Sequence, residues 1–179
     1  MASAPDRHVV FVEPPRLVGD GDLDHRIERV ARRVRTHHLV SAASRREPGR
    51  HLVLVGPTAS GKSAVAVELA LQRCAEGRPV EIVSCDSMAV YRGMDIGTAT
   101  PSIDERSGIP HHLLDVVEPS EEFSLQRFVG LVDDALDGIE SRGADAVLVG
   151  GTGLYVQAVV DGLQPPPQFP AVAAELELL

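Results

Sequence analysis

The sequence predicts an α/β domain in which helices flank a parallel β-sheet. Short apolar runs alternate with segments of helical periodicity from residue 51 onward, and two of these runs lead directly into glycine-rich turns. Strands that alternate with helices are joined by crossover connections, which give a parallel sheet. With 179 residues, of which 44% are hydrophobic and 24% charged, the chain is long enough to form one domain with a buried core.

The individual elements follow from the positions of apolar residues and glycines. Apolar runs predict strands over residues 51–55, 80–86, 111–117 and 144–149. Small and aliphatic residues at helical spacing predict helices over residues 63–77, 124–143 and 154–160. A long polar loop is expected between the second and third strands, over residues 87–110.

The first fifty residues are predicted to be an extension of the main domain, which covers residues 51–164. The extension holds a short strand in HVVFVEPP and an amphipathic helix whose apolar residues are Leu23, Ile27, Val30 and Val34. A helix packed on the domain surface is the simpler interpretation of this pattern, and an RNA-binding arm is the alternative. Residues 165–179 are predicted to form a proline-rich spacer and the start of a helix.

Charge is distributed unevenly along the chain. Residues 1–50 hold ten arginines and seven acidic residues, whereas residues 51–179 hold seven basic and nineteen acidic residues. An acidic surface is poorly suited to binding the phosphates of a nucleic acid. If RNA is the substrate, we therefore expect most of the binding to come from outside the acidic part of the chain.

Cysteine content and hydropathy indicate a cytoplasmic protein with no membrane partner. Cys74 and Cys85 form neither a CxxC metal pair nor a disulfide framework, and we expect both to be small apolar residues of the interior. The sequence contains no apolar run of the length that crosses a bilayer, and its first residues lack the pattern of a secretory signal.

The strongest motif is GPTASGKS, which follows the expected strand 51–55. It fits the pattern GxxxxGK[ST] and consists of Gly56, Pro57, Thr58, Ala59, Ser60, Gly61, Lys62 and Ser63. The glycines allow the backbone to approach an anion, successive N–H groups point inward, and the following helix adds its positive end. Lys62, the only lysine in the chain, would bind the outer phosphate oxygens, and Ser63 would bind Mg²⁺. The motif therefore predicts a P-loop NTPase-like fold that holds a diphosphate or triphosphate, with an ordinary glycine turn as the alternative.

Two further features are expected beside this loop. Asp86 and Ser87 follow Cys85 at the end of the expected strand 80–86, and Gly150-Gly151-Thr152-Gly153 follows Val149. Because the carboxyl ends of parallel strands share one edge of a sheet, these residues should lie near the phosphate loop. Asp86 is a candidate metal ligand or proton acceptor, and Thr152 is either a helix cap or a ligand-binding residue. The double glycine predicts that another group comes close to the backbone there.

Four blocks together resemble one known family, the tRNA dimethylallyltransferases, also called tRNA isopentenyltransferases or IPP transferases. The blocks are GPTASGKS, DSMAVYRGMDIGTATP, GIPHHLLDVVEPSEEFS and VGGTGLYVQAVVDGL, in the family's order and at similar spacing. The resemblance covers about residues 51–170 and leaves residues 1–50 outside. It implies transfer of a dimethylallyl group from dimethylallyl diphosphate to the exocyclic 6-amino group of adenosine 37 in the tRNA anticodon loop.

The resemblance assigns roles to individual residues of this sequence. Lys62, the loop amides and Mg²⁺ on Ser63 would stabilise the departing diphosphate, and Asp86 would take the proton of the adenine amine. Ser87, Met88 and Ala89 would border the base, and Thr152 would meet the tRNA or the diphosphate. His111 and His112 are adjacent and therefore a poor chelating pair, so we expect a structural role for them.

The sequence departs from the family pattern at two positions and in length. Ala89 stands where many family members have Gln, and Thr100 stands where Lys is usual. Family members continue for about as long again, with an inserted helical domain and basic segments that bind the anticodon stem. The resemblance thus implies a truncated, monomeric form that binds tRNA weakly and whose activity the sequence leaves open.

Three alternatives remain at this point. An adenylate isopentenyltransferase would use the same chemistry on free AMP, ADP or ATP, although MDIGTA and PHHLLD favour the tRNA family. A P-loop kinase of a small metabolite would consume ATP with Mg²⁺. A non-catalytic remnant would bind diphosphate or nucleotide without forming a product.

Overall fold

The computed structural model describes residues 7–11, 51–96, 98 and 100–163. The helix expected around Leu23–Val34 and the proline-rich spacer at 165–179 lie outside the described residues, so both stay predictions. The described elements are β1 (Arg7–Phe11), β2 (His51–Val55), α2 (Lys62–Ala75), β3 (Val80–Ser84), β4 (His111–His112), α3 (Leu125–Ser141), β5 (Asp145–Gly150) and α4 (Gly153–Asp161).

The strands form one parallel sheet in the order β1-β2-β5-β3-β4. Each neighbouring pair is parallel, so the predicted α/β architecture with crossover helices is confirmed. The short strand expected in the first fifty residues is also confirmed, and it pairs with β2 at the sheet edge, from Arg7↔His51 to Phe11↔Val55. That part of the extension therefore belongs to the main sheet.

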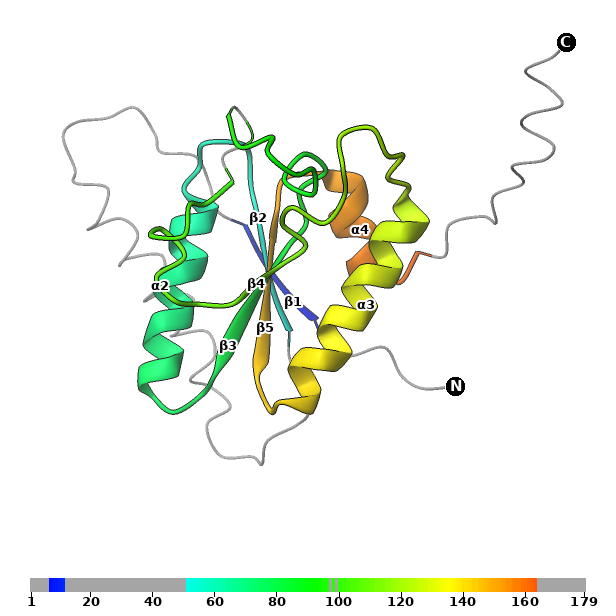
Figure 1. Ribbon diagram of the computed structural model, residues 1–179. Helices are drawn as coiled ribbons and strands as arrows, with labels where there is room; N and C mark the ends of the chain where they lie inside the picture. Colours follow the sequence, from blue (N-terminus) through cyan, green and yellow to red (C-terminus); the bar gives the residue numbers. More distant parts are fainter. Residues whose placement is uncertain (1–6, 12–50, 97, 99, 164–179) are drawn as a thin grey trace, which may run out of the picture.

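Helices cover both faces of the sheet. In Figure 1, α2 lies on one side of the strands, and α3 and α4 lie on the other. The burial of the strands follows this arrangement, because successive side chains of a strand point to opposite faces. In β2, Leu52 and Leu54 belong to the core beneath α2, whereas Val53 and Val55 belong to the core beneath α3 and α4.

Helix α3 shows how local sequence fixes an element. Its first residue follows Ser124, whose hydroxyl accepts a hydrogen bond of 3.2 Å from the backbone N–H of Arg127. The apolar positions expected from helical spacing are buried against the sheet, and they include Phe128, Val132, Leu136 and Ile139. This packing places the end of α3 beside the start of β5.

The third expected strand is much shorter than residues 111–117. Only His111 and His112 pair with β3, and a single bridge joins Val117 to Tyr91 further along. The strand stops because Leu113 and Asp115 adopt left-handed backbone conformations, with φ of 60° and 55°. Residues in that conformation cannot continue an extended ladder, so the chain turns towards the loop that follows β3.

Candidate active site

The three sequence features expected at one sheet edge do lie together. β5 lies between β2 and β3, with Val55 opposite Gly150 and Ser84 opposite Val149. The loops that follow these strands therefore start at the same level, and they gather at the upper end of the sheet in Figure 1. This is the edge where open parallel sheets bind ligands.

The phosphate loop has the backbone geometry of an anion-binding turn. Ala59 and Gly61, on either side of Ser60, have left-handed φ values of 61° and 84°. The N–H of Ser60 donates to the carbonyl of Pro57 at 3.3 Å, and the N–H of Val65 donates to Gly61 as α2 begins. When left-handed residues alternate with residues of ordinary backbone conformation, neighbouring N–H groups point towards one place. Here that place lies beside the positive N-terminal end of α2.

Lys62 lies across this loop. Its Nζ donates a 2.7 Å hydrogen bond to the carbonyl oxygen of Pro57. Partial burial lowers the pKa of Lys62 below its ordinary value, and the carboxylate of Asp86 acts in the opposite direction. The lysine of the P-loop and the acid at the end of β3 are therefore close enough to interact electrostatically, as the shared sheet edge predicts.

Asp86 is held by the backbone that follows it. Its Oδ1 accepts hydrogen bonds from the N–H groups of Met88 at 2.8 Å and Ala89 at 3.4 Å. Within the described part of the chain these are the hydrogen bonds of this carboxylate, and both use the same oxygen. The second oxygen, Oδ2, is left available to a nucleophile or a cation.

Thr152 occupies the N-cap position of α4, but its side chain does not cap the helix. Its hydroxyl accepts a 3.2 Å hydrogen bond from the N–H of Ser87 and lies 3.3 Å from the Ser87 Oγ, to which it donates. A simple capping role for Thr152 is therefore wrong. The residue joins the end of β5 to the segment that carries Asp86.

The double glycine before Thr152 fits the close approach predicted from the sequence. A Cβ atom on Gly150 would lie 2.3 Å from the carbonyl oxygen of Cys85, a distance that real side chains do not allow. A Cβ atom on Gly151 would lie 3.3 Å from the carbonyl of Gly56 and 3.7 Å from Lys62 Nζ. The two glycines thus allow β5 to approach β3 on one side and the phosphate loop on the other.

The residues predicted to border a base differ in exposure. Met88 is 43% exposed at this edge, whereas Ala89 is 4% exposed and packs into the interior. Ser87 is half-buried beneath Thr152. Any contact of Ala89 with a ligand would therefore depend on its backbone, while Met88 offers an apolar side chain to one.

The donor set at this edge is suitable for Mg²⁺ but does not form a complete protein cage. Ser63 is exposed at the start of α2, and Asp86 supplies a carboxylate at the same edge of the sheet. The described residues contain no group of three or more His, Cys, Asp or Glu side chains that could hold a metal. Mg²⁺ often binds through one or two protein oxygens and completes its shell with substrate phosphates and water, so the residues fit.

An aromatic cluster contains two residues that were not singled out from the sequence, Phe123 and Tyr155. Tyr155 stacks on Phe128 with centroids 4.1 Å apart, and Phe123 lies between Tyr155 and Tyr91 at 6.4 and 6.5 Å. Burial, with a smaller contribution from Tyr91, raises the pKa of Tyr155. The spacing of Tyr155 three residues after Thr152, on the same helical face, is the signal that could have identified it.

A family model confirms the resemblance seen in the sequence. The model described as IPP transferase matches residues 89–179, which is half of the chain. The chain belongs to the IPP transferase family. The site residues Lys62 and Asp86 precede the matched range, so their assignment depends on the motifs and geometry described above.

Similar proteins from bacteria carry related names. The chain is 49% identical over 129 residues to a protein of Anaeromyxobacter sp. (strain K) named tRNA dimethylallyltransferase, and this match covers 72% of the chain and 41% of that relative. A Desulforudis audaxviator protein of the same name is 54% identical over 110 residues, which cover 62% of the chain and 34% of the relative. The chain thus spans about two fifths of the length of such relatives.

Solved structures of the same family share the fold. The full-length tRNA isopentenylpyrophosphate transferase of Bacillus halodurans matches with a TM-score of 0.59 and 44% identity, over 72% of this chain and 41% of that one. A eukaryotic dimethylallyltransferase acting on tRNA matches with a TM-score of 0.54 and 37% identity, over 59% and 25% of the two chains. Among the described helices of the chain, none has the length and apolar content needed to span a membrane.

Proposed function

We propose that this chain transfers a dimethylallyl group from dimethylallyl diphosphate to the exocyclic 6-amino group of adenosine 37 in tRNA. The observation that carries the proposal is the position of Asp86, a carboxylate that follows β3 at the sheet edge where the phosphate loop follows β2. A site of this kind combines a place for the leaving group with a proton acceptor. The names of similar proteins, which are tRNA dimethylallyltransferases, support the same chemistry.

The phosphate loop would hold the group that leaves. Breaking the bond between the allylic carbon and its oxygen places negative charge on the diphosphate. Lys62 and the N–H groups around Ser60 can stabilise this charge, because they are oriented before the reaction begins. A Mg²⁺ ion on Ser63 and the diphosphate oxygens would add further charge stabilisation.

Asp86 would act on the nucleophile. The adenine amine is weakly nucleophilic because its lone pair is delocalised into the ring. As the new C–N bond forms, the amine nitrogen gives up a proton. The proposed acceptor is Oδ2 of Asp86, which accepts no hydrogen bond from the residues that the structure describes. The hydrogen bonds that Met88 and Ala89 donate to Oδ1 fix the orientation of this carboxylate.

The target base must leave its stack to reach this edge. Extruding a nucleotide from an anticodon loop costs less than extruding one from a duplex, because the loop base is not held by a complementary strand. The exposed side chain of Met88 offers an apolar surface for such a base. Ser87 precedes Met88 in the chain, and its hydroxyl accepts a hydrogen bond from Thr152. We propose that the reaction takes place in the cytoplasm and that the protein acts as a monomer.

The proposal is tested by incubating the chain with dimethylallyl diphosphate, Mg²⁺ and unmodified tRNA. Nucleoside analysis should then detect isopentenyladenosine, and free AMP in place of tRNA should give no modified nucleotide. Modification of AMP alone would support an adenylate isopentenyltransferase instead. Consumption of ATP with a phosphorylated product would support a small-molecule kinase. Mg²⁺-dependent binding of diphosphate without any product would identify a non-catalytic binding protein.

A further inference from the structure

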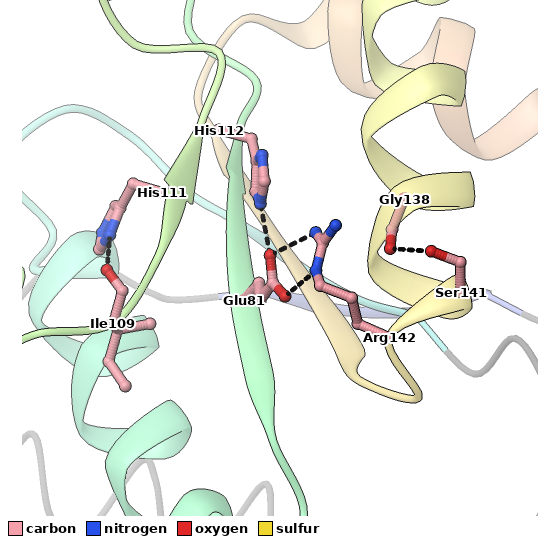
Figure 2. A network of polar contacts seen from close by, with 7 residues as sticks. All are labelled: Glu81, Ile109, His111, His112, Gly138, Ser141 and Arg142. Atoms are coloured by element: carbon pink, nitrogen blue, oxygen red, sulfur yellow. Dashed lines mark hydrogen bonds and ion pairs between the residues drawn. The ribbon is translucent and has the colours of Figure 1, made fainter.

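Glu81 is a buried carboxylate that the proposed reaction does not use. It lies on β3, is 8% exposed, and accepts hydrogen bonds of 2.9 Å from both Nε and Nη2 of Arg142. The Nε2 of His112, on β4, donates to the same carboxylate at 2.6 Å (Figure 2). We refer to Glu81, His112 and Arg142 as the Glu81 clamp.

In the Glu81 clamp, the negative charge of the Glu81 carboxylate is paired with the positive charge of Arg142. A buried carboxylate is costly unless it is paired and hydrogen-bonded, and the guanidinium of Arg142 provides a two-pronged partner. That hydrogen bond is the main cause that lowers the pKa of Glu81 below its ordinary value, so the group is ionised near neutral pH. Because an ionised carboxylate only accepts hydrogen bonds, His112 must carry a hydrogen on Nε2.

A strap of strained backbone begins directly after His112. The strap comprises residues 113–117, and its left-handed residues Leu113 and Asp115 have φ values of 60° and 55°. Non-glycine residues keep such conformations only when their surroundings hold them. The bond between His112 and Glu81, together with the backbone pairing of β4 with β3, anchors one end of the strap.

The other end of the strap is bound to the segment after Asp86. The N–H of Asp115 donates to the carbonyl of Ala89 at 3.1 Å, and the N–H of Val116 donates to the carbonyl of Val90 at 2.8 Å. The guanidinium of Arg92 returns a 2.9 Å hydrogen bond to the carbonyl of Asp115. The strap therefore connects the Glu81 clamp to residues 89–92.

A continuous set of contacts now reaches the carboxylate of Asp86. Ala89 accepts a hydrogen bond from the strap through its carbonyl and donates one to Asp86 Oδ1 through its N–H. The neighbouring N–H of Met88 donates to the same oxygen. Any shift of the strap would move the two N–H groups that orient this carboxylate.

We propose that His112 is a positioning residue for Asp86. Its hydrogen bond to Glu81 holds the strap, and the strap holds residues 88–90 so that the carboxylate of Asp86 faces the amine it deprotonates. His112 touches neither the reacting atoms nor the diphosphate in this account. The inference rests on the proposed role of Asp86 and adds the residue that keeps it in place.

Isosteric substitutions separate this role from general stability. In His112→Gln the side-chain amide nitrogen lies near the place of Nε2 and can still donate to Glu81. In His112→Asn the side-chain amide nitrogen lies near the place of Nδ1. The asparagine side chain is therefore too short to reach the carboxylate of Glu81. The matched control is His111→Asn, because His111 uses Nδ1 to bind the carbonyl of Ile109 at 2.8 Å and points away from Glu81 (Figure 2).

Amide hydrogen exchange of the ligand-free chain is the closing experiment. We expect amides of residues 86–92 to exchange about tenfold faster in His112→Asn, and at the unchanged rate in His112→Gln and His111→Asn. Amides of α2 should exchange at the same rate in all four proteins. Unchanged exchange at residues 86–92, or an equal acceleration in α2, would overturn the inference.

Turnover gives a second, independent readout. With dimethylallyl diphosphate and tRNA, kcat of His112→Asn should fall about tenfold while the KM for dimethylallyl diphosphate stays the same, and His112→Gln should match the unaltered chain. Equal kcat values in all variants would contradict the inference. If the unaltered chain forms no product, the proposed function fails on that result, while hydrogen exchange still decides the role of His112.

Discussion

Thr152 and Ser87 hydrogen-bond to each other although 65 residues separate them. The threonine hydroxyl accepts from the Ser87 N–H at 3.2 Å and donates to the Ser87 Oγ at 3.3 Å. Through this pair the loop after β5 and the loop after β3 are joined at the ligand-binding edge of the sheet. The position of Asp86 relative to the phosphate loop therefore depends on Thr152.

Removing the Thr152 hydroxyl should impair the site more than the fold. In Thr152→Val the shape of the side chain is kept, and the loss of two weak hydrogen bonds should lower the free energy of unfolding by about 1 kcal/mol. The rate of tRNA modification should fall at least about tenfold, because Ser87 and Asp86 lose their link to β5. Urea unfolding and nucleoside analysis measure the two effects. Thr152→Ser is the control, and a loss of activity in it as large as in the valine variant would contradict this role.

Adding a methyl group to Gly150 should damage the fold itself. The Cβ atom would lie 2.3 Å from the carbonyl oxygen of Cys85, and neither strand can move away without losing hydrogen bonds between β3 and β5. We expect Gly150→Ala to lower the free energy of unfolding by about 3 kcal/mol, as measured by urea unfolding.

Gly151→Ala provides the comparison for that prediction. Its Cβ atom would contact the carbonyl of Gly56 at 3.3 Å and Lys62 Nζ at 3.7 Å, so its main effect should be on ligand binding. Calorimetry should show weaker binding of inorganic diphosphate with a change in stability below about 1 kcal/mol. Equal losses in the free energy of unfolding in the two alanine variants would show that the close approach of Cys85 to Gly150 does not determine the stability of the fold.

Lys62 should determine diphosphate affinity. Replacing it with methionine removes a charged donor from the loop, which should weaken binding of inorganic diphosphate with Mg²⁺ by about tenfold to a hundredfold. Arg78→Met removes one positive charge before β3, at the opposite edge of the sheet, and should leave the affinity within about twofold. Titration calorimetry measures both. Similar losses in the two variants would indicate that binding depends on overall charge and not on the loop.

The Glu81 clamp should give the fold a defined dependence on pH. The pKa of Glu81 is lowered from 4.5, mainly by its hydrogen bond with Arg142. A carboxyl group with a depressed pKa in the folded state contributes stability that is complete above the unfolded value of 4.5. This contribution is lost as the pH falls below 4.5 and through the folded pKa.

Comparison with Glu81→Gln isolates that contribution. At pH 7 the unaltered chain should exceed the glutamine variant by about 2 kcal/mol in the free energy of unfolding, and the difference should shrink as the pH is lowered below 4.5. Urea unfolding at a series of pH values measures it. A difference that stays constant down to pH 3 would show that ionisation of Glu81 does not stabilise the fold.

The sequence predicted the parts of the site that depend on local pattern. GPTASGKS predicted an anion-binding turn, and parallel strands predicted that Asp86 and Thr152 would lie at its edge. Two adjacent glycines predicted a close approach, which the backbone of Cys85 makes at Gly150. Each of these inferences needs only the order of strands and the chemistry of a few neighbouring residues.

Contacts between distant segments were beyond such inference. The partners of Glu81 lie 31 and 61 residues away, so nothing near β3 indicates that its carboxylate is paired. Thr152 follows the statistics of a helix cap, yet its hydroxyl bonds to Ser87 because the two loops meet in space. The left-handed turns at Leu113 and Asp115 likewise depend on packing and interrupt a segment whose apolar residues predict a strand.

Transfer of isotopically labelled dimethylallyl groups to tRNA tests the central claim most directly. We predict that the unaltered chain labels adenosine in the anticodon loop with Mg²⁺ present, and that Asp86→Asn reduces the rate by about a hundredfold or more. Asp137→Asn, which changes an exposed carboxylate on α3, should retain full activity. Labelling by Asp86→Asn at the rate of the unaltered chain would contradict the account.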